Sequence, residues 1–392
     1  MKNTNISTPD IKGKAAVVGV GTSRYGRLPE YDAYDLGQWA LREALFDCGL
    51  DYSDIDGLIV NRIPSYGRFA ELCGIDPRYT LSTLGHGRFS GICIQTAALL
   101  VASGVVNTVA LVYANDGASA GTAYGGDPSK YGGAAGAYGT TDGHWAPYGM
   151  TSPGAFHALM MQRHMHLYGT TEEHLGKIAM TFRDHAHLNP DAVMRERFSM
   201  DDYLAAKQIC SPLRLLDYCL INDGAVAMII TRADLAEGLR KPPVYIHGAS
   251  QASQFTDSSF PPKDFWAAPM AKVANDVFAM AGVGREDIDS LMIYDNFTPT
   301  VLFTLEGFGY CKPGQSGPWV AEGHLSLEGR YPANTNGGHL SESYLQGWGL
   351  NVEAVRQLRG DCGDRQIKSP NFVQYMAASP VVTSVIYGRE RS

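Results

Sequence analysis

The stretch Asn334-Thr-Asn-Gly-Gly-His-Leu-Ser-Glu-Ser-Tyr-Leu-Gln-Gly-Trp-Gly349 carries the features that decide the fold and the site. It contains a glycine pair in a polar loop, then Tyr344 and a helical run that ends at Gly360. A glycine pair lets the backbone approach another group closely, because no Cβ atom is in the way. A loop that leads into a helix presents free N–H groups, which favour a carbonyl oxygen or a developing oxyanion. We therefore predict that this loop belongs to a binding or catalytic site.

The composition is that of an ordinary globular protein. The 392 residues are 45% hydrophobic and 18% charged, and the length suggests two or three domains. A net charge of -8 argues against a nucleic-acid partner. The seven cysteines include no Cys-x-x-Cys pair, so we expect no metal site. The polar N-terminus and the short apolar runs predict no secretory signal and no membrane span, and hence a cytoplasmic protein with reduced thiols.

A helix, a glycine turn and an Asp-Ile-Asp strand occur twice. The first copy has Gly49 and then the strand at 54–60, and the second has Gly282 and then the strand at 287–293. The two glycines are separated by the same number of residues as the two strands. This regular recurrence predicts the internal duplication of a large unit.

A second pair of matching segments supports the duplication. One helix ends at Gly104 and another at Gly360, and a β-rich segment follows each, at 106–113 and 381–387. The spacing differs from that of the first pair, so an insertion separates the two matches. Strands and helices that alternate twice over predict two similar α/β halves, with mixed sheets buried under helices.

The insertion sets the expected domain boundaries. We assign residues 1–245 to an N-terminal half and residues 246–392 to a C-terminal half. An inserted loop region, at about 116–243, belongs to the first half. It begins with the glycine- and tyrosine-rich segment 117–149, which is typical of a long functional or interfacial loop.

Three segments together resemble the thiolase superfamily, in the branch of the sterol-carrier-protein thiolases and lipid-transfer proteins. They are the run 213–227 with its Ile-Asn-Asp-Gly-Ala core, Ile293-Tyr-Asp-Asn-Phe297, and the loop that starts at Asn334. The resemblance covers nearly the whole chain. It implies a five-layer αβαβα fold, a homodimer, and an acyl-CoA site where the two halves meet.

The chain departs from that family at its catalytic positions. Arg88 occupies the place of the nucleophilic cysteine, and Tyr294-Asp-Asn-Phe stands where the branch has His-Asp-Cys-Phe. Tyr344 replaces the histidine of Gly-His-Pro, and the second cysteine is replaced near Met376. Arg88 precedes Gly104 by the same number of residues as Tyr344 precedes Gly360, so the two are equivalent positions. An arginine cannot be a nucleophile, which argues against Claisen chemistry through an acyl-enzyme.

The remaining pattern is similar to the retro-aldolases of this branch that shorten steroid side chains. Such enzymes cleave a β-hydroxyacyl-CoA to a ketone or aldehyde and a shorter acyl-CoA. CoA is then part of the substrate, and no cofactor is expected in the chain. We predict Tyr294 and Tyr344 as the acid–base pair, with their individual roles unassigned.

The resemblance also suggests groups that bind the substrate. Asn296 and the backbone of Gly337 and Gly338 are candidates for holding the thioester oxygen. His339, beside the glycine pair, is a candidate donor that supports substrate binding. Arg88 either binds a CoA phosphate or holds its own loop through carboxylates.

The family implies a partner and leaves two alternatives open. Related aldolases work with a small zinc-ribbon and OB-fold protein, so a heterotetramer is expected. The first alternative is a true thiolase, an acetyl-CoA acyltransferase that uses Cys93 as its nucleophile. The second is a non-catalytic lipid-binding subunit. Cys93 shares a helix face with Ala97 and Leu100, which favours a small core residue over a nucleophile.

Overall fold

The computed structural model describes residues 10–83, 89–121, 150, 152–255 and 261–391. Among these residues, nine strands form one mixed sheet in the order β3-β2-β4-β7-β1-β8-β11-β10-β9. The strands are β1 (Ala15–Thr22), β2 (Gly57–Asn61), β3 (Tyr79–Thr83), β4 (Thr108–Asn115), β7 (Gly224–Arg232), β8 (Val244–Ser253), β9 (Ser290–Ile293), β10 (Phe372–Ala377) and β11 (Val381–Gly388). A separate hairpin consists of β5 (Gln208–Cys210) and β6 (Leu213–Arg214).

The sheet repeats one pattern on either side of its centre. Outward from the middle run β1-β7-β4-β2 on one side and β8-β11-β10-β9 on the other. In each set the first two pairings are antiparallel and the third is parallel. A short antiparallel contact between β1 and β8 joins the two half-sheets. The predicted duplication is therefore visible in the strand connections.

The inserted region is shorter than the sequence suggested. β7 lies in the middle of the N-terminal half-sheet, between β4 and β1. The expected limit near residue 243 is thus wrong, because the insertion ends before Gly224. The segment 117–149 was expected to be a long loop, and its part from 122 to 149 lies outside the described residues. The boundary expected at 245 and 246 falls within the first residues of β8, which begins at Val244.

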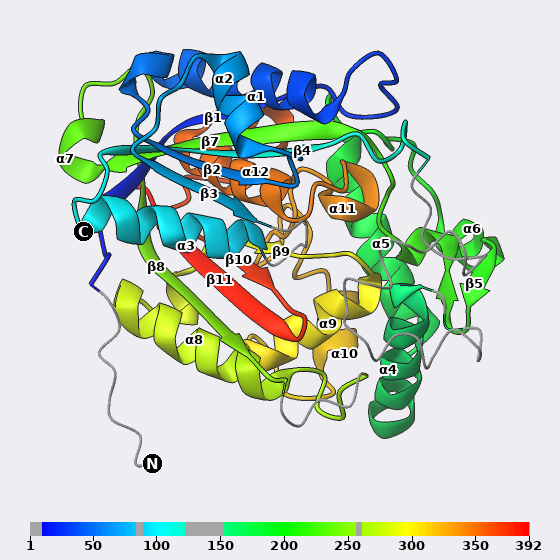
Figure 1. Ribbon diagram of the computed structural model, residues 1–392. Coiled ribbons are helices and arrows are strands. Elements are labelled where there is room, and N and C mark those ends of the chain that lie inside the picture. The colour runs from blue at the N-terminus through cyan, green and yellow to red at the C-terminus, as the bar shows by residue number, and fades with distance from the viewer. Residues whose placement is uncertain (1–9, 84–88, 122–149, 151, 256–260, 392) are drawn as a thin grey trace.

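Helices and half-sheets form five layers, as the αβαβα prediction requires (Figure 1). The outer helices on the N-terminal side are α1 (Ala33–Cys48) and α2 (Tyr66–Cys73), and the outer helix on the C-terminal side is α8 (Ala267–Ala281). The central layer consists of α3 (Phe89–Ala102) and α12 (Trp348–Arg359), whose buried side chains share one core with both half-sheets. The thiolase-like fold is confirmed.

The sequence of α3 explains its central place. The helix has apolar residues on every side, and the side that carries Cys93, Ile94 and Ala97 is fully buried, whereas Leu99 on another side is exposed. Its Gly91 allows close contact with the C-terminal half-sheet, because a Cβ atom there would overlap the side chain of Thr383. The N-terminal end of α3 is thereby held against β11.

Further helices lie beside the ends of the strands. They are α4 (Pro153–Tyr168), α5 (Glu172–His187), α6 (Met200–Ala205), α7 (Ala233–Ala236), α9 (Thr298–Gly307), α10 (Ser316–Ala321) and α11 (Gly338–Ser341). Single 3-10 turns occur at Tyr52–Asp54, Leu215–Asp217, Arg285–Asp287 and Gly363–Arg365. Among the described helices, none combines the length and apolar character that a membrane crossing needs.

Candidate active site

The hydroxyl oxygens of Tyr294 and Tyr344 lie 2.9 Å apart, although the residues are 50 positions apart in sequence. Tyr294 directly follows β9, and its N–H donates to the carbonyl of Met376 on β10. Tyr344 lies in the loop between α11 and α12. Tyr294 is buried and Tyr344 half-buried, and both contact the core around the central helices. The structure thus brings the two predicted phenols into direct contact.

The Ile-Asn-Asp-Gly-Ala segment before β7 holds the Tyr344 loop. The side-chain oxygen of Asn222 accepts the backbone N–H of Tyr344 at 2.6 Å. Asn222 is itself fixed, because its carbonyl accepts a hydrogen bond from the side chain of Asn115 at the end of β4. Two strands of the N-terminal half therefore position a loop of the C-terminal half.

Asp295 connects the segment of Tyr294 to the loop of Tyr344. Its buried carboxylate accepts the backbone N–H groups of His339, at 2.9 Å, and of Leu340, at 3.2 Å. Gly338 must be a glycine for this contact, because a Cβ atom there would overlap the Asp295 carboxylate. Its φ of +63° also favours glycine.

The prediction that the backbone of Gly337 and Gly338 binds the thioester oxygen is wrong. The N–H of Gly337 donates to the carbonyl of Asn334 at 2.8 Å. The N–H of Gly338 donates to the side chain of Asn336 at 3.1 Å. The glycine pair instead lets the loop turn tightly around Asp295, and both amides are used within that loop.

The side chain of His339 is 1% exposed and faces protein groups, and its predicted support of substrate binding stays a prediction. Its Nε2 accepts the backbone N–H of Gly347 at 2.9 Å. Its Nδ1 lies 3.0 Å from the Asp295 carboxylate, without the alignment of a regular hydrogen bond. The ring packs against both phenol rings, with centroids 4.7 Å from Tyr294 and 5.3 Å from Tyr344.

The roles predicted for Asn296 and Arg88 stay predictions. Asn296 is half-buried, its side-chain oxygen accepts the hydroxyl of Thr300 at 2.8 Å, and its carbonyl accepts the N–H of Cys219. Arg88 lies outside the described residues. The next residue in the chain, Phe89, is the first residue of α3.

Cys93 has the environment of a core residue. Its side chain is completely buried in the central layer, with Sγ 3.5 Å from the hydroxyl of Thr83. Burial raises the pKa of this thiol to about 12. A thiol with that pKa stays protonated near neutral pH and is a poor nucleophile. Met376, near the place of the second thiolase cysteine, is also fully buried.

Buried carboxyl groups beneath the loop were not predicted from the sequence. Glu342 accepts hydrogen bonds from the side chains of Asn189 and Asn336, and burial, with repulsion from Glu353, raises its pKa to about 8. Glu353 forms an ion pair of 3.0 Å with Arg365. The only sequence signal was position, because Glu342 is two residues before Tyr344.

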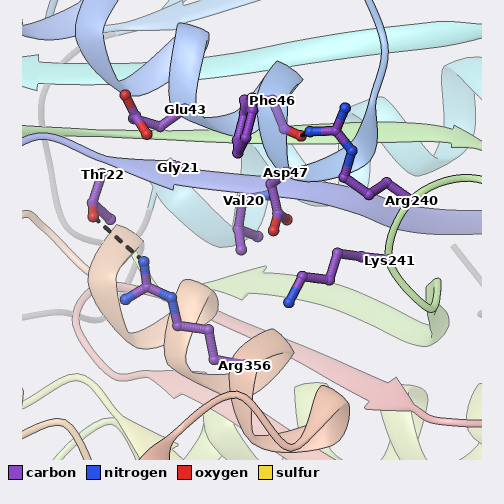
Figure 2. Close-up of a pocket in the computed structure, with 9 residues that line it drawn as sticks. All are labelled: Val20, Gly21, Thr22, Glu43, Phe46, Asp47, Arg240, Lys241 and Arg356. Atoms are coloured by element: carbon purple, nitrogen blue, oxygen red, sulfur yellow. Dashed lines mark hydrogen bonds between the residues drawn. The ribbon is translucent and has the colours of Figure 1, made fainter.

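A hollow of about 230 Å³ lies elsewhere, between β1, α1 and α12 (Figure 2). It is lined by Val20, Gly21, Thr22, Glu43, Phe46, Asp47, Arg240, Lys241 and Arg356. None of the predicted site residues lines it, and its charged groups carry both signs. Within the described part of the chain, no group of three or more His, Cys, Asp and Glu side chains is arranged to hold a metal ion.

Comparison with known proteins points to one group of relatives. Residues 252–380 match the family model "Thiolase C-terminal domain-like". The chain is 31% identical to a steroid side-chain-cleaving aldolase of Thermomonospora curvata, over 97% of this chain and 99% of that protein. It is 32% identical to the 17-hydroxy-3-oxo-4-pregnene-20-carboxyl-CoA lyase of Mycobacterium tuberculosis, over 89% and 92%. A solved Ltp2-ChsH2(DUF35) aldolase superimposes with a TM-score of 0.89 at 29% identity, over 98% of this chain and 100% of that one.

Proposed function

Because the chain belongs to the thiolase superfamily, in the branch of the steroid side-chain-cleaving aldolases, we propose that it is a CoA-thioester retro-aldolase. The observation that carries the proposal is the 2.9 Å contact between the hydroxyls of Tyr294 and Tyr344. A nucleophilic route has less support, because Cys93 is a buried, protonated thiol. The chain is then a carbon–carbon lyase built on a thiolase-like fold.

The proposed reaction needs two proton transfers and no covalent intermediate. One tyrosine, as its phenolate, takes the proton of the substrate β-hydroxyl, and the electron pair of that O–H bond forms the new C=O bond. The bond between the α- and β-carbons breaks, and its electron pair moves onto the α-carbon and the thioester oxygen. The α-carbon then takes up a proton from the other phenol, which yields the shorter acyl-CoA. Nothing is oxidised or reduced overall.

The contact between the phenols suits these transfers. A tyrosine alone is almost wholly protonated near neutral pH, since its ordinary pKa is about 10, so little phenolate is present to act as a base. A phenolate that accepts a hydrogen bond from a second phenol is stabilised, because hydrogen bonding to the charged form favours ionisation. The same contact lets a proton pass between the two oxygens within one turnover. Asn296 remains the proposed donor to the thioester oxygen as negative charge develops there.

We propose a steroid substrate with a short CoA-ester side chain. The name of the mycobacterial relative specifies a 17-hydroxy steroid whose carboxyl-CoA group is borne by C20. In such a molecule the hydroxyl is on the carbon β to the thioester, as a retro-aldol cleavage requires. The products would be a 17-ketosteroid and a shorter acyl-CoA. CoA enters and leaves with the substrate, and we propose no cofactor for the chain itself.

The proposed assembly is a cytoplasmic homodimer that binds a small zinc-ribbon and OB-fold partner, which together make a heterotetramer. The support is the similar solved structure, whose description pairs Ltp2 with ChsH2(DUF35).

The proposed function is tested by incubating the purified chain, alone and with a DUF35-type partner, with 17-hydroxy-3-oxo-4-pregnene-20-carboxyl-CoA. We expect equimolar release of a 17-ketosteroid and a shorter acyl-CoA, with no change in the intact mass of the protein. Absence of cleavage under both conditions would overturn the proposal in favour of a lipid-binding subunit. A stable acyl adduct on Cys93 would overturn it in favour of a thiolase.

A further inference from the structure

His339 lies at the centre of a cluster of three rings that includes both proposed catalytic phenols. Its centroid is closer to each tyrosine ring than the tyrosine rings are to one another, at 4.7 and 5.3 Å against 6.4 Å. All three contacts are edge-to-face, the arrangement that aromatic quadrupoles favour. The imidazole is therefore the shared surface against which Tyr294 and Tyr344 are packed.

The ring also closes the loop that carries Tyr344. Its Nε2 accepts the N–H of Gly347, so a hydrogen bond spans from residue 339 to residue 347 with Tyr344 in between. Gly347 directly precedes α12, and a Cβ atom at Gly347 would overlap the hydroxyl of Tyr375. One end of the loop is thus fixed to the start of the central helix.

Asp295 fixes the other side of the ring. Since Nε2 accepts a hydrogen bond, the neutral imidazole carries its proton on Nδ1, which lies 3.0 Å from Oδ1 of Asp295. The same oxygen accepts the backbone N–H of His339 at 2.9 Å. Asp295 is the next residue after Tyr294. His339 is therefore attached to the segment of one phenol through Asp295 and to the loop of the other through Gly347.

We propose that His339 is a positioning residue that holds the hydroxyl oxygens of Tyr294 and Tyr344 at hydrogen-bonding distance and exchanges no proton with the substrate. The inference rests on the proposed function and extends it. Both ring nitrogens face protein groups and the side chain is buried, so the imidazole has no path to a substrate proton. It affects catalysis by setting the distance between the hydroxyl oxygens of the two tyrosines.

The two nitrogens can be tested separately with amide side chains. In H339Q the side-chain oxygen reaches about as far as Nε2 and can still accept the N–H of Gly347. H339N reaches only as far as Nδ1 and loses that contact, while H339F keeps an aromatic ring without either nitrogen. H324Q is the matched control, because His324 is a surface histidine paired with Glu322 and lies outside the site.

We expect kcat for carbon–carbon cleavage to fall on the order of 10²-fold in H339N and H339F, the cost of a displacement of about 1 Å. H339Q should recover most of that loss, and KM should change by no more than about twofold in all three. Thermal unfolding, followed by circular dichroism, identifies any variant that fails to fold. H324Q should match the wild type in every measurement.

Crystal structures of H339Q and H339N supply a readout that does not depend on activity. The separation of the Tyr294 and Tyr344 oxygens should stay near 2.9 Å in H339Q and increase in H339N. An unchanged separation in H339N would overturn the positioning role, as would equal losses of kcat in H339Q and H339N. If the wild type cleaves no β-hydroxyacyl-CoA, the proposed function fails, and the two structures still decide the role of His339.

Discussion

Glu342 should make the stability of this protein fall as pH rises. The carboxyl group is buried beneath the Tyr344 loop between the side chains of Asn189 and Asn336. Burial raises its pKa to about 8, and repulsion from Glu353 adds to this effect. Arg365 and Arg356 oppose the increase without cancelling it. The folded protein therefore holds Glu342 as a neutral acid near neutral pH.

The sign and size of the effect follow from proton linkage. Between about pH 4.5, the ordinary pKa of a glutamate, and about pH 8, the folded state keeps the proton that the unfolded state has released. Stability is therefore highest below pH 4.5 for this group and is lost as pH rises to 8. Each pH unit in this interval lowers the free energy of unfolding by about 1.4 kcal/mol, so the whole interval lowers it by at most about 5 kcal/mol. E342Q keeps the size of the side chain and removes the titration.

The assay is urea denaturation of wild type and E342Q between about pH 4 and pH 9. At low pH, E342Q should be less stable by about 1 kcal/mol, because the amide satisfies its neighbours less well. The two stabilities should be equal near about pH 5.2, where titration has cost the wild type about 1 kcal/mol, and above that pH E342Q should be the more stable protein. Identical pH slopes for the two proteins would refute a neutral buried Glu342.

E306Q is the control of opposite sign. Burial alone would raise the pKa of Glu306, but hydrogen bonds from His164 and Ser316 outweigh burial and lower that pKa. Its contribution to stability is present above the ordinary glutamate pKa and is lost as pH falls. E306Q should therefore be less stable than the wild type at neutral pH. It should still show the fall in stability with rising pH that Glu342 produces.

Three further substitutions test the site. G338A places a Cβ atom against the Asp295 carboxylate at a φ of +63°, so we expect a loss of about 1–3 kcal/mol of stability in thermal unfolding and a large loss of cleavage. Normal cleavage would contradict the close contact between the loop and the Asp295 carboxylate. D295N puts a donor beside the N–H groups of His339 and Leu340, so in steady-state kinetics kcat should fall by at least about tenfold with KM little changed. An unaffected kcat would argue against the connection that Asp295 makes between the Tyr294 segment and the Tyr344 loop. C93A should keep cleavage and lose about 1–2 kcal/mol from the core in a denaturation assay; complete loss of turnover in a folded protein would restore the thiolase alternative.

Much of the fold could be predicted because its signals are local and occur twice. The Asp-Ile-Asp strands and their glycine turns identified the two halves. The place of β7 could not be predicted in the same way, because Gly224–Arg232 follows a long insertion and pairs with β4, more than a hundred residues earlier. Strand order depends on tertiary packing, which no local pattern records.

The site, too, could be predicted from the sequence only in part. Tyr294 and Tyr344 could be predicted as a pair because each replaces a polar catalytic group of the family, and the structure brings their oxygens together. The use of the Gly337 and Gly338 amides could not be predicted, because it depends on Asp295, which reaches the loop from over forty residues away. The burial of His339 follows from the same contact. Sequence spacing identifies the residues of a loop, but packing decides which groups remain available.

A double-mutant cycle on the two tyrosines tests the central claim most directly. The measurement is the rate constant for carbon–carbon cleavage of a β-hydroxyacyl-CoA in wild type, Y294F, Y344F and the double variant. We predict that each single variant is slower by about 10²- to 10⁴-fold and that the double variant is no slower than the worse single one, because the two hydroxyls act as one unit. Cleavage at the wild-type rate in both single variants would contradict the account.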